Sequence, residues 1–97
     1  MSTLVLLEAK AKAGRIAELM ALFRKELPST RSYEGCRGIT AHTGSEDDHA
    51  IVLVEHWDSA EHYRKYLAWR GETGVLAQLS ALFEGPASIR YFDSHDV

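Results

Sequence analysis

Hydrophobic and polar positions alternate with two different periods in the first third of the chain. From Thr3 to Ala11 the residues alternate between two faces, and both faces are apolar in the first half, which predicts a strand covered on both sides. From Arg15 to Leu27 the apolar residues recur at helical spacing and form one stripe. Gly14 is expected to cap this helix. Pro28 is expected to end or distort it, because the residue before a proline avoids helical backbone angles.

The same change of period recurs further along. Arg37 to Thr43 alternates as a strand, the polar stretch 44–48 predicts a hairpin loop, and the unbroken run Ile51 to Val54 predicts a strand that Glu55, His56 and Trp57 close. Asp58, with Glu61 three residues later, has the spacing of a capping box and predicts a helix start. That helix is interrupted at 71–74 and resumes over 75–83, and residues 87–92 predict the last strand.

This order predicts one α+β domain spanning residues 1–97, with the ferredoxin-like pattern β-α-β-β-α-β and an antiparallel sheet. Both crossover helices lie on one face of such a sheet. The first and third strands are nevertheless apolar on both faces, so the second face also needs a cover. In a chain this short, a second copy is the economical cover, and we expect a homodimer.

Composition and charge indicate which partners the protein does not bind and in which cellular compartment it is found. The net charge of −3 gives no basic surface for nucleic acid, and no apolar run approaches the roughly 20 residues of a membrane span. Cys36 is the single cysteine, which favours a reducing compartment. The first residues lack the basic start and cleavage site of a signal peptide. We therefore expect a cytoplasmic protein with neither nucleic acid nor membrane as partner.

Several short motifs occur in a recognisable order. A lysine-rich turn ends at Gly14, residues 34–36 (Glu-Gly-Cys) precede the second strand, residues 55–57 (Glu-His-Trp) lead into 58–61, and residues 83–86 (Phe-Glu-Gly-Pro) precede the last strand. In this order the chain resembles the antibiotic biosynthesis monooxygenase family of the dimeric α+β barrel superfamily, over nearly its whole length. The resemblance implies pairing of two copies into a dimeric α+β barrel.

The resemblance also implies a chemistry. Members known as enzymes oxidise phenolic, naphthol-like or quinol substrates with O₂ and without metal or flavin. Such chemistry needs an apolar pocket, a group that assists loss of a proton, and a donor or cation beside the resulting oxyanion. The expected function is a cofactor-independent monooxygenase for a small electron-rich aromatic. The alternative is a non-catalytic small-molecule-binding or stress-associated dimer on the same fold.

Haem degradation, a third activity in the family, is disfavoured by two departures. The haem-degrading members carry an asparagine in the first strand, whereas this chain contains none. They also carry an iron-ligating histidine where this chain has Leu76. The five histidines do not form a metal-ligand spacing, so no metal is expected. Cys36 has no assignable partner and is not expected to act as a nucleophile.

The candidate catalytic residues are Trp57, Tyr66 and Arg70. Trp57 matches the tryptophan that ends the third strand in the family, although a core role is its alternative. Tyr66 stands where many members have a histidine, and a phenol is a poor base at neutral pH. Arg70 precedes a glycine-bounded turn that is a plausible pocket mouth, and the alternative is that its side chain points outward into solvent.

A second set of residues is expected to bind substrate. It consists of Trp69, His42, Tyr63 and Arg90. Packing on the sheet is the alternative for Tyr63, and solvent exposure is the alternative for Arg90. Glu55, on the strand face of Trp57, is interpreted as a solvated or ion-paired carboxylate at the end of a strand.

Overall fold

The structure is a computed structural model and describes residues 2–97. The elements follow in the order β1 (Thr3–Lys10), α1 (Ile16–Arg31), β2 (Cys36–Thr43), β3 (Ala50–Trp57), α2 (Ala60–Glu72), α3 (Val75–Leu82) and β4 (Ser88–Asp93). The strands form one sheet in the order β2-β3-β1-β4, with every neighbouring pair antiparallel. The predicted α+β, ferredoxin-like order is confirmed.

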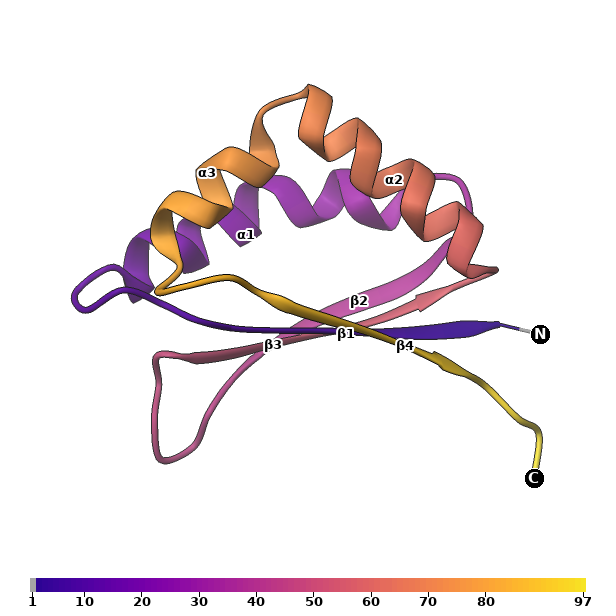
Figure 1. Cartoon of the computed structure of the whole chain (residues 1–97), viewed down its shortest axis with the longest axis horizontal. Helices are drawn as coiled ribbons and strands as arrows, with labels where there is room; N and C mark the ends of the chain where they lie inside the picture. The colour runs from indigo at the N-terminus through magenta and orange to yellow at the C-terminus, as the bar shows by residue number, and fades with distance from the viewer. Residues whose placement is uncertain (1) are drawn as a thin grey trace.

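All the helices pack on one face of this sheet (Figure 1). The register places the side chains of Val5, Ile39 and Glu55 together on that covered face, because directly opposed residues point to the same side. The apolar stripe of α1 meets this face through Leu19 and Phe23, both buried. The period-2 and period-3.6 patterns in the sequence therefore converge on one shared core.

The core divides into two parts of different composition. The first, here the aliphatic half, consists of Leu7, Ala11, Leu19, Phe23, Leu27, Ile39, Ile51, Leu53, Leu82 and Phe83. The second, here the aromatic half, consists of Val5, Trp57, Tyr63 and Tyr66, with Tyr33, Cys36, Leu67 and Trp69 packed against it. The aromatic half lies where β3 ends and α2 begins.

The other face of the sheet carries no helix in the part of the chain that is described (Figure 1). Its side chains include Leu4, Leu6, Val52 and Val54, which are only partly buried, and Phe92, which is 41% exposed. This is the second apolar face that the strand pattern indicated. That a second copy covers it stays a prediction.

Helix α1 corrects two expectations. The helix runs through Pro28 to Arg31, so the expectation that Pro28 ends it is wrong, and residues 29–31 are helical. Proline removes one backbone donor, and side-chain bonds from Thr30 to α2 hold the last turn in place. Gly14 lies in the preceding turn with φ of 75°, and the N-cap position is Arg15.

The start of α2 corrects a third expectation. The capping residue is Ser59, whose hydroxyl accepts a hydrogen bond of 3.1 Å from the backbone N–H of His62. Asp58 instead accepts a hydrogen bond of 2.7 Å from Arg37 Nε at the start of β2. No helix in residues 2–97 has the length and apolar character needed to cross a membrane.

Candidate functional site

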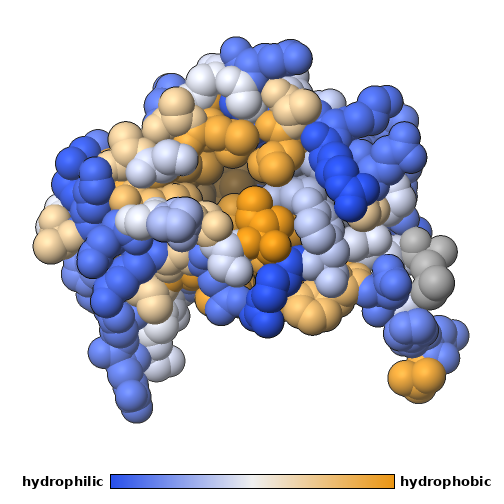
Figure 2. Space-filling view, viewed as in Figure 1, coloured by the Kyte–Doolittle hydropathy of each residue, from blue (hydrophilic) through white to orange (hydrophobic). Residues whose placement is uncertain are grey.

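A cavity lies between the helices and the covered face of the sheet. Its walls are mostly apolar and include Leu7, Leu22, Phe23, Leu53, Leu76 and Leu79. Figure 2 shows hydrophobic residues gathered around a hollow beneath α2 and α3. The free volume of the cavity is about 30 Å³. In this conformation the cavity has room for water and not for an aromatic ring.

One polar wall of the cavity is a hydrogen-bonded group centred on Arg70. Its guanidinium donates to the Tyr66 hydroxyl (Nε, 3.0 Å) and to the Thr30 hydroxyl (2.9 Å). It also donates to the Glu26 carboxylate (3.2 Å) and to the Glu26 backbone carbonyl (2.7 Å). Arg70 is 3% exposed, so its charge is compensated by these partners rather than by water. The alternative in which Arg70 points outward is wrong.

Tyr66 is a hydrogen-bonding group of this wall and not a base. Its hydroxyl lies 2.7 Å from Thr30 Oγ1 and accepts from Arg70. Burial raises its pKa, and this outweighs the hydrogen bonds from Thr30 and Arg70, which lower it. The phenol therefore keeps its proton at neutral pH, and a neighbouring cation makes that proton a better donor.

The opposite side of the cavity contains a buried carboxyl group, that of Glu55. It is 2% exposed and has no ion-pair partner within residues 2–97. Its hydrogen bond comes from Trp57 Nε1, which donates to Oε1 at 3.1 Å. Burial raises the pKa of Glu55 to about 7, although the Trp57 bond lowers it. The interpretation of Glu55 as a solvated or ion-paired strand-end group is wrong, because strand alternation places it on the covered face.

The predicted aromatic residues occupy different positions around the cavity. Tyr63 lines it, whereas Trp57 and Trp69 lie outside its lining. Trp57 has no exposed surface and packs against Tyr66 with ring centroids 4.9 Å apart. Trp69 stacks on Tyr33 at 5.2 Å, and the Arg70 guanidinium lies 4.6 Å from its ring. Trp57 therefore reaches the cavity through the carboxyl group of Glu55.

His42 and Arg90 lie on the uncovered face of the sheet. His42 is exposed, and its Nε2 lies 2.9 Å from the Thr40 hydroxyl. Arg90 forms an ion pair with Glu8 of the neighbouring strand. Their cross-strand partners are Val52 and Leu6 respectively, so neither belongs to the cavity wall. The structure thus brings Tyr63, Tyr66 and Arg70 together and separates His42 and Arg90 from them.

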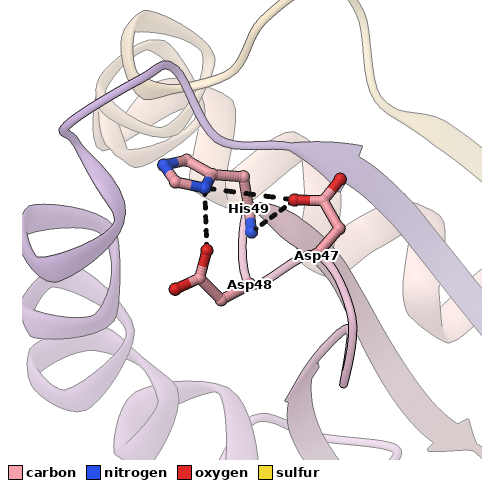
Figure 3. Close-up of side chains that lie close together, drawn as sticks. All are labelled: Asp47, Asp48 and His49. Carbon is pink, nitrogen blue, oxygen red and sulfur yellow. Dashed lines mark hydrogen bonds and ion pairs between the residues drawn. The ribbon is translucent and has the colours of Figure 1, made fainter.

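A second polar cluster lies in the loop between β2 and β3 (Figure 3). Ligand atoms of Asp47, Asp48 and His49 lie within 4.8 Å of one another. Its internal contacts account for this grouping: His49 Nδ1 lies 2.9 Å from Asp48 and the His49 backbone N–H donates to Asp47 at 3.1 Å. The two carboxylates are exposed, as is common for acidic turns. We assign no ligand to this loop.

Three polar residues of the cavity lining are absent from the sequence-based candidates: Glu26, Thr30 and Glu55. For Glu55 a signal exists, since strand alternation puts it on the face of Leu53 and Trp57, and a carboxyl group on that face is an unusual choice. No such signal exists for Thr30. Its hydrogen-bond partners are 36 and 40 residues away along the chain. It also follows Pro28, after which no helix was expected.

Comparison with known proteins was made at the levels of sequence and of structure. The family model described as antibiotic biosynthesis monooxygenase matches residues 3–72. This range extends from β1 to the end of α2 and includes both polar walls of the cavity. A search of curated proteins gave no sequence match.

Solved structures match almost the whole chain. A conserved protein from Methanosarcina mazei has a TM-score of 0.89 at 16% identity, covering 98% of this chain and 94% of its own. Rv0793 from Mycobacterium tuberculosis has a TM-score of 0.83 at 20% identity, with coverages of 100% and 98%. SnoaB, a cofactor-independent oxygenase from Streptomyces nogalater whose structure is that of a point mutant, has a TM-score of 0.84 at 18% identity, with coverages of 99% and 95%. At these identities the similarity establishes a shared fold.

Proposed function

This chain belongs to the antibiotic biosynthesis monooxygenase family, and we propose that it oxidises a small electron-rich aromatic molecule of phenol, naphthol or quinol type with O₂ and without a cofactor. The observation that carries the proposal is the apolar cavity that has a hydrogen-bond donor backed by a buried cation on one wall. Leucine and phenylalanine side chains suit an aromatic ring, and O₂ is itself apolar.

The donor is the Tyr66 hydroxyl, and Arg70 is the cation behind it. A phenol gives an electron to O₂ far more readily after it has lost its proton, so the protein must stabilise an oxyanion. A protonated Tyr66 can donate to that oxygen, and Arg70 strengthens the donation through its bond of 3.0 Å to the same hydroxyl. In the overall reaction one hydrogen leaves a ring carbon and one leaves the phenolic hydroxyl, and one oxygen atom of O₂ becomes a carbonyl oxygen on that carbon, so that a quinone forms. The other oxygen atom leaves with both hydrogens as water.

The experiment is O₂ uptake by the purified protein with a panel of quinols and naphthols. We expect uptake above the spontaneous rate with at least one of them. We also expect Tyr66→Phe to lower the rate by about 10- to 100-fold, because one oxyanion donor is lost. Tyr91→Phe, a tyrosine that is 41% exposed and outside the cavity lining, is the matched control and should keep the full rate.

Binding without turnover would favour the second candidate, a non-catalytic small-molecule-binding protein. The narrow free volume of the cavity is the observation on its side, since a ring can enter only if the walls move. If quinols and naphthols bind in the cavity but O₂ uptake never exceeds the spontaneous rate, the oxygenase proposal is wrong.

We further propose that the protein is a homodimer closed through the uncovered face of the sheet. Leu6 and Val54 are opposed at the centre of that face, where a charge would oppose association. Sedimentation of the unmodified protein at micromolar concentration should give about twice the chain mass of 10.8 kDa. Val54→Lys should shift the protein toward the monomer, whereas Ala81→Lys on the exposed side of α3 should not. A clean monomer for the unmodified protein would contradict the proposal.

A further inference from the structure

We propose that Glu55 is the catalytic residue that accepts the proton of a bound phenolic hydroxyl, and that Trp57 is the positioning residue that holds its carboxyl group at the cavity. This inference rests on the proposed function, because it names the proton acceptor of the same site. The residues proposed as catalytic from the sequence cannot fill that role. Tyr66 stays protonated, Arg70 is a cation, and the indole of Trp57 is a donor only.

Glu55 faces the cavity but is shielded from bulk solvent. Its side chain lines the cavity and is 2% exposed. Its neighbours across the sheet are Val5 and Ile39, which offer neither charge nor hydrogen-bonding side chains. A carboxyl group without an ion pair in such surroundings keeps a free oxygen for a ligand.

Titratable groups around Glu55 come from each packed element. α2 contributes Tyr63 and Tyr66, and burial followed by the Glu55 charge raises the pKa of Tyr63. β2 contributes Cys36, whose pKa is raised first by burial and also by Glu55. All of these groups are neutral at neutral pH. Arg70, the cation of the cavity lining, is engaged by Glu26, Thr30 and Tyr66.

Trp57 fixes the carboxyl group through one bond and leaves the other oxygen unused. Its Nε1 donates to Oε1 at 3.1 Å, and its ring is held by Tyr63 (5.6 Å) and Tyr66 (4.9 Å). The indole therefore orients Oε2 independently of any ligand. Because the bond favours the ionised form, it also brings the pKa of Glu55 down from what burial alone would give, to about 7. A base is most effective when its pKa lies near the working pH.

The proton step is simple to balance. The substrate O–H bond breaks, its electron pair stays on the substrate oxygen, and the proton forms an O–H bond on the Glu55 carboxylate. Tyr66, on the opposite wall, donates to the oxyanion so formed. O₂ then adds to a ring carbon of the anion, and its distal oxygen takes the proton from Glu55 to give a hydroperoxide. The ring carbon loses its hydrogen as a proton, the electron pair of that C–H bond forms the new C=O bond, the O–O bond breaks, and the departing hydroxide leaves with the proton as water. Glu55 ends in its starting state.

The first test follows the ionisation of Glu55 without any substrate. The indole N–H resonance of Trp57 in ¹⁵N-labelled protein should shift with pH with a midpoint at about 7, because the N–H donates to the titrating carboxyl. The indole of Trp69, which lies outside the cavity lining, is the internal control. Glu55→Gln keeps an oxygen that accepts the bond and should abolish the shift. A Trp57 resonance that does not titrate through the neutral range in the wild type would overturn the inference.

The second test uses 4-nitrophenol as probe, since its anion is yellow and its neutral form is not. Below the pH at which the free probe ionises, the wild type should bind it as the anion, and Glu55→Gln should bind it as the neutral phenol. Glu61→Gln, an exposed glutamate in the first turn of α2, should behave as wild type.

Trp57→Phe should raise the pH midpoint of the anion signal, which a role in packing alone would not do. Identical colour in wild type and Glu55→Gln, or failure of the wild type to bind the probe, would overturn the inference. Both tests are independent of O₂, so a failure of the oxygenase proposal would be seen separately.

Discussion

The aliphatic and aromatic halves of the core differ in what they bury. The aliphatic half is built from leucine, isoleucine, phenylalanine and alanine side chains, which bring no polar side-chain atom into the interior. The buried polar and charged side chains of residues 2–97, namely Thr3, Thr30, Glu55 and Arg70, lie on the strands and helices that frame the aromatic half. The difference teaches that buried polar groups are kept to one half of the core, although both halves line the cavity, the aliphatic half with Leu7, Phe23 and Leu53. One half supplies burial, and the other accepts desolvation cost to hold polar groups at a cavity.

The largest effect is expected in the aliphatic half, where Leu19 is completely buried. Leu19→Ala should lower the free energy of unfolding by about 3 kcal/mol, because the side chain is lost and a void remains. Urea denaturation followed by circular dichroism measures this. The pH midpoint of the Trp57 indole resonance should stay where it is in the wild type. A changed midpoint would show that the two halves are not separate.

A nearly equal loss of stability is expected from the ionisation of Glu55, and it develops as the pH rises above 4.5. The folded-state pKa of about 7 is higher than the ordinary 4.5, so the folded state holds its proton longer than the unfolded state does. The wild type should therefore lose stability relative to Glu55→Gln as pH rises from 4.5 to about 7, by about 3 kcal/mol in total, and the difference should be constant below this range. Denaturation of both proteins across that range measures it. A difference that does not vary with pH would mean that Glu55 has an ordinary pKa.

A smaller effect is expected within the polar wall. Tyr66→Phe and Thr30→Val each remove one side of a buried hydrogen bond of 2.7 Å, and each should cost about 1–2 kcal/mol. The double variant should cost less than the sum of the two, because the second change removes a partner already left unsatisfied. Urea denaturation of the four proteins measures the coupling. Strict additivity would show that the two hydroxyls do not act as one unit.

The smallest effect is expected at the joint between the halves. Gly74 separates α2, which carries Tyr63 and Tyr66, from α3, which carries Leu82 of the aliphatic half. Its φ is +84°, and a Cβ added there would meet no atom within 4 Å. Gly74→Ala should therefore cost about 1 kcal/mol through backbone strain alone. Gly71→Ala, at a glycine within α2, is the control and should be neutral or slightly stabilising. Thermal unfolding measures the stability of both variants. An equal change in melting temperature would show that the positive φ of Gly74 does not matter for stability.

The order of helices and strands was predictable because it depends on the local spacing of apolar residues. Both the two-residue spacing of strands and the helical spacing are clear in this sequence. Ser59 was missed as the N-cap because Asp58, one residue earlier, can also accept a hydrogen bond from the first turn of a helix. Asp58 does not cap α2 because its carboxylate binds Arg37 on β2, and this contact cannot be predicted from the local sequence. The continuation of α1 beyond Pro28 depends on bonds to α2 and is non-local.

The position of a candidate site residue was predictable only where it depends on a single helix or strand. Tyr63, Tyr66 and Arg70 share a helical face, so their common location follows from spacing. The face taken by His42 depends on the register of β2 against β3, which shifts between Cys36 and Gly38. Such an irregularity cannot be read from a strand by itself.

The break at Gly74 has a consequence for kinetics. The outer wall of the cavity is formed partly by Leu76 and Leu79 on α3, whereas Tyr66 and Arg70 are on α2. If Leu76 and Leu79 move outward to admit a ring, α3 can do so without breaking a bond of the Arg70 group, since those bonds lie within α2 or join α2 to α1. The rate of ligand entry would then be a property of α3 and fall well below the diffusion limit. The strength of binding would be a property of α2 and β3, so entry and affinity could change independently.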